Sequence, residues 1–300
     1  MGPDNTLAKV VDALCAPSRV PGGFMLHSPS PHHQALPSRD AVISMVEDLR
    51  SVLFPGYFGV SSVTAENVRF HVGSTLDRVR RTLQEQIMSG LCFVCALGDA
   101  RSYEDCQADA AAKTDAFLAR LPEVRRLLAT DAQAAFEGDP AATSPAETIF
   151  CYPGMLAITN QRLAHELHKL KVPLIPRMIT EHAHSLTGID IHPGARIDTA
   201  FFIDHGTGTV IGETTLIGKG VRLYQGVTLG AKSFPLDEHG NPIKGIDRHP
   251  IVEDEVIVYS GATILGRVTI GKGSVIGGNV WLTQSVPPGS RISQPHQTNA

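Results

Sequence analysis

The chain has 300 residues, a formal net charge of −4 and 42% hydrophobic residues, which suits two domains or one domain with a long extension. This charge predicts no nucleic-acid partner, and no apolar run approaches the roughly 20 residues that cross a membrane. Five cysteines without regular spacing are typical of a reducing compartment, so we expect a cytoplasmic protein without membrane or nucleic-acid partners.

The first part of the chain is predicted to be an arm followed by helices. Residues 17–40 are rich in Pro, Ser, Gly and His, so we assign 1–38 to a flexible N-terminal arm. Apolar residues then recur at helical spacing, which predicts an α-helical domain at 39–175. Within it we expect helices at 39–50, 75–95, 102–120, 121–137 and 154–171.

Cys92 and Cys95 form a CxxC pair in this helical part. The pair can be interpreted as a metal or redox site, with Cys106 as a third thiol, or as two thiols on one buried helix face. Free cysteine packs as a small hydrophobic residue, and no second CxxC or CxxH completes a zinc set. We therefore favour the buried face and predict no metal site.

A six-residue repeat extends from Ile191 to Leu282. Its second half places an aliphatic residue at every sixth position, at Val252, Val258, Ile264, Ile270, Ile276 and Leu282. This period fits neither an α-helix nor an alternating strand. It fits a parallel β-helix, in which three short strands make one triangular turn. We predict an α+β protein in which the α-helical domain is followed by a left-handed parallel β-helix at 176–286 and a tail at 287–300.

The repeat is interrupted once. Leu229 and Val252 are 23 positions apart (252 − 229), which is not a multiple of six, so a segment must leave the β-helix. Residues 231–250 have the Pro, Gly, Asn and Asp content of an extruded loop. Loops on a rigid scaffold often bind ligands or take part in catalysis.

Several polar residues in the repeat are candidates for chemistry. They are Asp190, His192, Asp204, His205, Glu213, Arg248 and His249. A histidine near a carboxylate can act as a general base, because an ordinary histidine pKa of about 6.5 suits proton transfer near neutrality. Asp190 and His205 are 15 positions apart (205 − 190), close to the roughly 18 residues of one β-helix turn, so they can lie on neighbouring coils. On spacing alone, a structural histidine remains the alternative.

Three strings, GIDIHPGARIDTAFFIDHGTGTVIGET, YQGVTLGA and DRHP, resemble the serine O-acetyltransferases of cysteine biosynthesis, in particular a longer bacterial subgroup. The resemblance covers about residues 135–290 and includes DPAA at 139–142 and YPG at 152–154. It implies transfer of the acetyl group of acetyl-CoA to the hydroxyl of L-serine, giving O-acetyl-L-serine and CoA. Acetyl-CoA would be a co-substrate, with no permanently bound cofactor.

The same resemblance implies roles for single residues. His205 would be the general base that takes the serine hydroxyl proton, and Asp190 would orient it. Asp139 and Asp204 would hold the substrate ammonium.

The opposite end of the substrate would be held by a different group of residues. Arg248 and His249 would hold the carboxylate, and Glu213 is placed among the substrate-binding residues. Acetyl-CoA would lie in a groove between coils of two subunits, with plain coil packing as the alternative for each lining residue. The lining residues are Ser260, Val275 and Gly278.

The resemblance also bears on assembly and regulation. We expect a homotrimer, with two trimers joining through their helical parts as a further option, and L-cysteine as a candidate feedback inhibitor. The chain ends HQTNA, without the C-terminal isoleucine that the family often uses to bind O-acetylserine sulfhydrylase, so we do not expect that complex.

Two other functions are compatible with the pattern. One is a different acetyl-CoA-dependent hexapeptide acetyltransferase, acting on a sugar or an antibiotic. The other is a zinc enzyme like the γ-carbonic anhydrases, with His205, His239 and His249 as ligands. A scaffold without activity is a third and weaker alternative.

Overall fold

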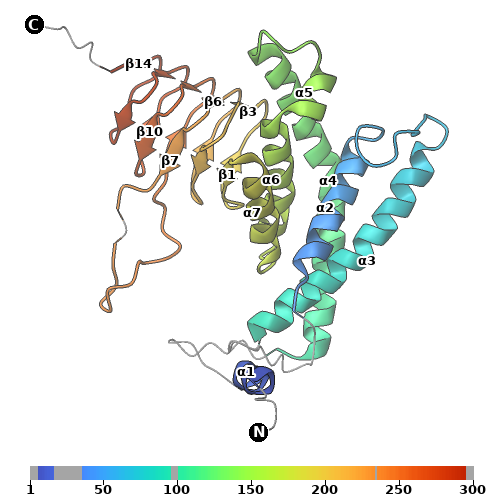
Figure 1. Ribbon diagram of the computed structural model, residues 1–300. Helices are drawn as coiled ribbons and strands as arrows, with labels where there is room; N and C mark the ends of the chain where they lie inside the picture. The colour runs from blue at the N-terminus through green and yellow to red at the C-terminus, as the bar shows by residue number, and fades with distance from the viewer. Residues whose placement is uncertain (1–5, 17–35, 96–100, 234, 295–300) are drawn as a thin grey trace, which may run out of the picture.

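The computed structural model describes residues 6–16, 36–95, 101–233 and 235–294. Within these residues, seven helices precede fourteen short strands, and the helices stand beside the stack of strands (Figure 1). The helices are α1 (Thr6–Cys15), α2 (Arg39–Leu53), α3 (Val68–Cys95), α4 (Tyr103–Gly138), α5 (Pro145–Cys151), α6 (Pro153–Lys169) and α7 (Ile175–Thr187). This order confirms the predicted fold class, a helical part followed by a parallel β-helix. No described helix is long and apolar enough to cross a membrane.

The helical part differs from the sequence prediction at one proline. Residues 103–138 form the single helix α4, with Pro122 inside it, where two helices were expected. A proline inside a helix removes one backbone hydrogen bond and is usually disfavoured. Here Phe117, Leu121, Val124 and Leu128 are buried on one face across the proline, so continuous packing keeps the helix intact.

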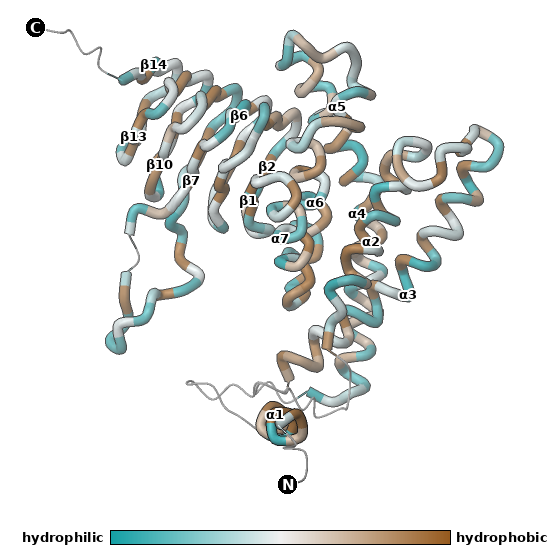
Figure 2. Tube along the Cα trace, viewed as in Figure 1, coloured by the Kyte–Doolittle hydropathy of each residue, from teal (hydrophilic) through white to brown (hydrophobic). Residues whose placement is uncertain are grey.

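The predicted domain boundaries also change. Helix α7 lies in the segment assigned to the β-helix, because Pro176 occupies the first turn of a helix, where proline is favoured, and Gly188 ends it with a left-handed φ of 69°. Strand β14 lies in the segment assigned to the tail. Most of the predicted arm lies outside the described residues, but its residues Thr6–Cys15 form α1, in which Leu7, Val10, Val11 and Leu14 are exposed. Figure 2 shows that α1 carries both hydrophobic and hydrophilic residues.

The cysteines of the CxxC pair are buried in α3, as expected for a packed helix face. Cys92 is fully buried and Cys95 is 8% exposed. The Cys95 Sγ lies 3.5 Å from the Cys106 Sγ of α4, and all three are free thiols. Burial raises the pKa of the Cys106 thiol to about 12, which keeps it protonated and unreactive.

The β-helix consists of three parallel sheets. The first sheet has the order β1-β4-β7-β10-β13, the second β2-β5-β8-β11 and the third β3-β6-β9-β12-β14. The strands are β1 (Asp190–Ile191), β2 (Arg196–Ile197), β3 (Phe202–Asp204), β4 (Val210–Ile211), β5 (Leu216–Ile217), β6 (Arg222–Tyr224), β7 (Thr228–Gly230), β8 (Ile251–Val252), β9 (Ile257–Val258), β10 (Thr263–Leu265), β11 (Thr269–Ile270), β12 (Val275–Ile276), β13 (Trp281–Leu282) and β14 (Arg291–Ile292).

The interruption of the repeat does not interrupt the core. Strand β7 ends at Gly230 and β8 begins at Ile251, and the chain between them projects away from the β-helix (Figure 1). Val252 nevertheless pairs with Ile217 of the preceding turn, and both side chains point into the buried interior. The loop therefore adds residues at one corner without breaking the aliphatic ladder.

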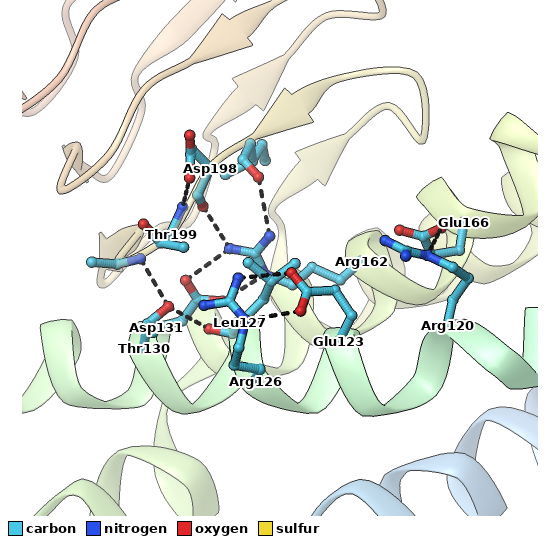
Figure 3. Close-up of polar contacts among 12 residues, drawn as sticks. Arg120, Glu123, Arg126, Leu127, Thr130, Asp131, Arg162, Glu166, Asp198 and Thr199 are labelled. Carbon is cyan, nitrogen blue, oxygen red and sulfur yellow. Dashed lines mark hydrogen bonds and ion pairs between the residues drawn. The ribbon is translucent and has the colours of Figure 1, made fainter.

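A buried ion pair joins the helical part to the first turn of the β-helix (Figure 3). The Arg162 guanidinium of α6 donates to both carboxylate oxygens of Asp131 in α4, at 2.6 and 2.8 Å. Arg162 also donates to the backbone carbonyls of Ile197 and Asp198, and Asp131 accepts from the backbone N–H of Phe201. Such a bidentate pair fixes orientation as well as distance. The pair therefore fixes the position of the C-terminal part of α4 relative to β3.

Candidate active site

The predicted site residues fall into two groups at opposite edges of the first sheet. The turn from β3 to β4 carries His205, and we call this turn with its neighbours Asp139, Tyr152 and Asp204 the His205 corner. The turns after β1 and β4, together with the end of the extruded loop, form the Arg248 corner. This second group consists of His192, Glu213, Thr214, Arg248 and His249.

His205 is pushed outward by its turn. It has a left-handed φ of 57°, which is uncommon for a residue with a side chain and often marks functional positions. The next residue, Gly206, has a φ of 91°, and a Cβ there would lie 2.5 Å from the Ile189 side chain. The His205 side chain is 74% exposed, with its Nε2 3.8 Å from the Asp204 Oδ1. An exposed imidazole beside a carboxylate can take up a proton from a ligand in solvent.

The helical part contributes the second carboxylate of this corner. Asp139 follows the last turn of α4, which ends before Pro140. Its Oδ2 accepts a 2.5 Å hydrogen bond from the Tyr152 hydroxyl, and its Oδ1 accepts from the Ala141 N–H at 2.8 Å. These bonds, led by that of Tyr152, lower the pKa of Asp139, and His205 lowers it further. Asp139 is therefore a stable anion close enough to His205 to interact with it.

Asp190 lies at the start of β1, at the same edge of the sheet. It pairs with Val210 in the ladder and is half-buried. Within the described chain, no hydrogen bond joins its carboxylate to the His205 ring; the carboxylate recorded beside the ring is that of Asp204. The expected orientation of His205 by Asp190 is thus not formed in the isolated chain.

The Arg248 corner is built around a fixed ion pair. The Arg248 Nη2 donates to the Glu213 Oε2 at 2.7 Å, and both side chains are partly exposed. Burial opposes the charge of Glu213, but the Arg248 hydrogen bond and nearby His192 outweigh it, so the pKa of Glu213 is lowered. A second anion meeting the remaining Arg248 donors would share the guanidinium with Glu213.

His249 is held in one tautomer beneath this pair. Its Nδ1 accepts from the Thr214 N–H at 3.1 Å, which leaves the proton of the neutral ring on Nε2. It is 6% exposed and packs over Gly212, where a Cβ would lie 2.0 Å from the imidazole Cδ2. Burial, assisted by the charge of Arg248, lowers the pKa of His249 to about 4. His249 therefore stays neutral near pH 7 and offers a hydrogen-bond donor.

His192 lies two coils earlier at the same corner and is also a neutral, partly buried histidine. Its Nδ1 accepts from the Gly194 N–H at 3.0 Å, and burial together with the charge of Arg177 lowers its pKa to about 4. His192 was a candidate residue without a predicted role.

Three further residues were missed because their neighbours become visible only in the fold. Thr214 accepts from the backbone N–H groups of both Arg248 and His249. Arg267 donates to the carbonyls of Thr214 and His249 and to Asp247. The third is Tyr152, for which the only sequence signal was the YPG string.

The proposed groove residues lie further along the structure. Ser260 follows β9 on the same edge as His205, and Gly278 packs against it, since a Cβ on Gly278 would lie 3.2 Å from the Ser260 carbonyl oxygen. Val275 lies on the neighbouring third sheet, paired with Ile257. Ser260 and Gly278 are thus in contact, and Val275 lies beside them on another face.

The positions of His205, His239 and His249 do not support the zinc-enzyme alternative. His205 and His249 lie at opposite edges of the first sheet, and His239 is exposed in the extruded loop. Across the part of the chain that the structure describes, no three His, Cys, Asp or Glu side chains are grouped as a metal site.

Comparison with known proteins identifies the family. The bacterial transferase hexapeptide (six repeats) model matches residues 249–284. A plasmid serine acetyltransferase of Synechococcus elongatus is 53% identical over 274 residues, covering 89% of this chain and 86% of the relative. A serine acetyltransferase 1 of Entamoeba histolytica, solved in complex with L-cysteine, is 37% identical with a TM-score of 0.72, covering 83% of this chain and 86% of that one.

A more distant solved structure carries a different ligand. The serine acetyltransferase of Brucella abortus, in complex with coenzyme A, has a TM-score of 0.54 and 26% identity, covering 83% of this chain and 91% of that one. With a curated relative matched over nearly its whole length, the chain belongs to the serine acetyltransferase family.

Proposed function

We propose that this chain transfers the acetyl group of acetyl-CoA to the hydroxyl of L-serine, with His205 as the general base. The observation that carries the proposal is the His205 corner, where an exposed imidazole lies beside the Asp139 and Asp204 carboxylates. Two carboxylates can bind the serine ammonium and leave the hydroxyl facing the imidazole. A neutral sugar lacks the positive charge that would pair with these two anions.

The reaction proceeds by direct attack. His205 takes the hydroxyl proton while the serine oxygen forms a bond to the acetyl carbonyl carbon. The resulting tetrahedral intermediate breaks its carbon–sulfur bond, and the CoA thiolate takes the proton from the imidazolium. O-acetyl-L-serine and CoA are the products, and no acetyl group is carried by the enzyme.

The substrate carboxylate requires residues that one chain cannot supply at this corner. The two corners are separated by the extended residues around β4, which span roughly 10 Å. Within the described chain no hydrogen bond or ion pair connects the His205 corner with the Arg248 corner. A complete site therefore needs the His205 corner of one copy against the Arg248 corner of another.

A homotrimer in which the first sheet faces the threefold axis provides this arrangement. The outer face of that sheet carries Val210 and Trp281, which are 37% and 69% exposed. Exposed apolar and aromatic side chains are favoured in subunit interfaces. A cyclic arrangement repeats one heterologous contact, so each of the sites would combine both corners.

We expect acetyl-CoA to bind along the edge that carries His205. At this edge Gly208, Gly226 and Gly261 stack with positive φ angles, and a Cβ added to Gly208 or Gly226 would lie 3.6 or 3.5 Å from the Cα of the next glycine. No side chain stands between a ligand and the backbone at these turns. The edge leads from His205 to Ser260 and Gly278, so the acetyl group would lie at the imidazole and the CoA arm along the glycines.

L-Cysteine is proposed as a competitor of serine. It carries the same ammonium and carboxylate and differs only in the thiol, so both corners would bind it. The cysteine complex of the Entamoeba relative supports this assignment.

Thiol release from acetyl-CoA tests the function. We expect release that depends on L-serine, with O-acetyl-L-serine as the product by mass spectrometry. Equal release of CoA thiol with L-serine and with serine amide would contradict the proposal that Arg248 binds the substrate carboxylate. Release with a sugar but not with serine would favour the other hexapeptide acetyltransferases.

A further inference from the structure

We propose that Tyr152 is a positioning residue for the substrate ammonium, because its hydroxyl holds the Asp139 carboxylate in the orientation that receives the ammonium. This inference rests on the proposed function, since it concerns the same site. Tyr152 is not expected to touch the reacting atoms and would act only through Asp139.

The hydrogen bonds of Asp139 leave a defined direction for a ligand. The Tyr152 hydroxyl donates to Oδ2 at 2.5 Å, and the Ala141 N–H donates to Oδ1 at 2.8 Å. An ionised carboxylate accepts about four hydrogen bonds, so each oxygen keeps one acceptor position. Because both oxygens are held, the carboxylate cannot rotate freely, and the remaining positions face a ligand at the His205 corner.

Tyr152 is itself fixed by the packing of two helices on the β-helix. It is the residue between α5 and α6, and its N–H donates to the Thr148 carbonyl. Two residues later, Gly154 approaches β3 so closely that a Cβ would lie 2.4 Å from the Ile203 carbonyl oxygen. Asp204 directly follows Ile203. The tyrosine is thereby tied to the strand that presents Asp204 and His205.

Asp139 is tied to the same strand from the other side. The preceding Gly138 packs on the Phe202 ring, 2.7 Å from a hypothetical Cβ, and its carbonyl accepts from Arg222 at 3.1 Å. The end of α4 and the start of α6 are therefore both held against β3. The Tyr152–Asp139 hydrogen bond links these two helix ends. It also raises the pKa of Tyr152, so the hydroxyl keeps the proton that it donates.

The test variant is Tyr152→Phe, which removes one hydroxyl and keeps the ring. We expect kcat/KM for L-serine to fall about tenfold while KM for acetyl-CoA stays unchanged, the usual loss for one charge-assisted hydrogen bond. The Ki of 3-hydroxypropanoate, which is serine without its ammonium, should change less than twofold. Tyr57→Phe, at a ring that packs on Phe150, is the matched control and should behave as the wild type.

A double-variant cycle separates positioning from a general structural role. If Tyr152 acts through Asp139, Asp139→Asn combined with Tyr152→Phe should lose no more serine activity than Asp139→Asn alone. Additive losses, or equal losses for serine and 3-hydroxypropanoate, would overturn the inference. Wild-type-like serine kinetics of Tyr152→Phe would overturn it too, whereas a wild-type enzyme that does not acetylate serine would instead refute the proposed function.

Discussion

The two corners of the first sheet use histidine in opposite ways. His205 is 74% exposed, lies beside carboxylates and has strained backbone, whereas His249 is 6% exposed, packs on a glycine and has a pKa lowered to about 4. A solvent-accessible ring near anions can exchange protons, and a buried ring near Arg248 can only donate a hydrogen bond. In the proposed mechanism, the environment rather than the residue type makes one histidine the base and the other a binding group.

The largest effect is expected when His205, the proposed general base, is replaced. His205→Asn should lower kcat by about 10²–10⁴, because proton transfer is lost while asparagine still tolerates a positive φ. Thiol release with L-serine measures the loss, and circular dichroism with sedimentation checks fold and assembly. Near-normal turnover of this variant would show that His205 is not the base.

Mixing two inactive variants tests whether the corners meet between copies. His205→Asn and Arg248→Ala each damage one corner, so trimers formed from equal amounts by refolding together should recover about a quarter of wild-type activity. Each variant keeps one corner intact. When the two variants assemble at random, an intact His205 corner meets an intact Arg248 corner at about a quarter of the subunit contacts. No recovery, despite mixed trimers seen by native mass spectrometry, would place each site within a single chain.

Thr214 holds the backbone of Arg248 and His249, so its replacement tests the binding role of the Arg248 corner. Thr214→Val removes the acceptor of the Arg248 and His249 N–H groups, and we expect KM for serine to rise about tenfold with KM for acetyl-CoA unchanged. Thr215→Val is the matched control, because the buried Thr215 hydroxyl has no hydrogen-bond partner among the described residues and its loss should be neutral or stabilising. A larger effect at Thr215 would contradict this account.

The smallest expected effect is the pH dependence of stability. Because the folded pKa of His249 is about 4, below its ordinary value near 6.5, the unfolded chain binds a proton first as pH falls. The free energy of unfolding should therefore fall from about pH 6.5 towards pH 4, and less steeply in His249→Asn. Denaturant unfolding at fixed protein concentration measures this, with the exposed His239→Asn as a control that keeps the wild-type slope.

The core of the β-helix could be predicted from the six-residue repeat. The six-residue period predicted which aliphatic side chains stack inside, and the observed pairs Ile217–Val252, Leu223–Val258 and Leu229–Ile264 confirm it across the interruption. The helix α7 was missed because the β-helix was predicted to begin at residue 176. Pro176 instead lies in the first turn of that helix.

The sequence by itself determined the period, the extruded loop and the identity of the polar residues, because these depend on local spacing and on motifs along the chain. Only the tertiary structure decided that His205 and Arg248 lie at opposite edges of one sheet, because His205 precedes β4 whereas the extruded loop returns Arg248 to Glu213 in the turn after β4. It also brought Tyr152 of the helical part to Asp139 and placed both beside His205. These contacts depend on how the helices pack on β3, where Gly138 lies against Phe202 and Gly154 against Ile203, and no local sequence pattern encodes that packing.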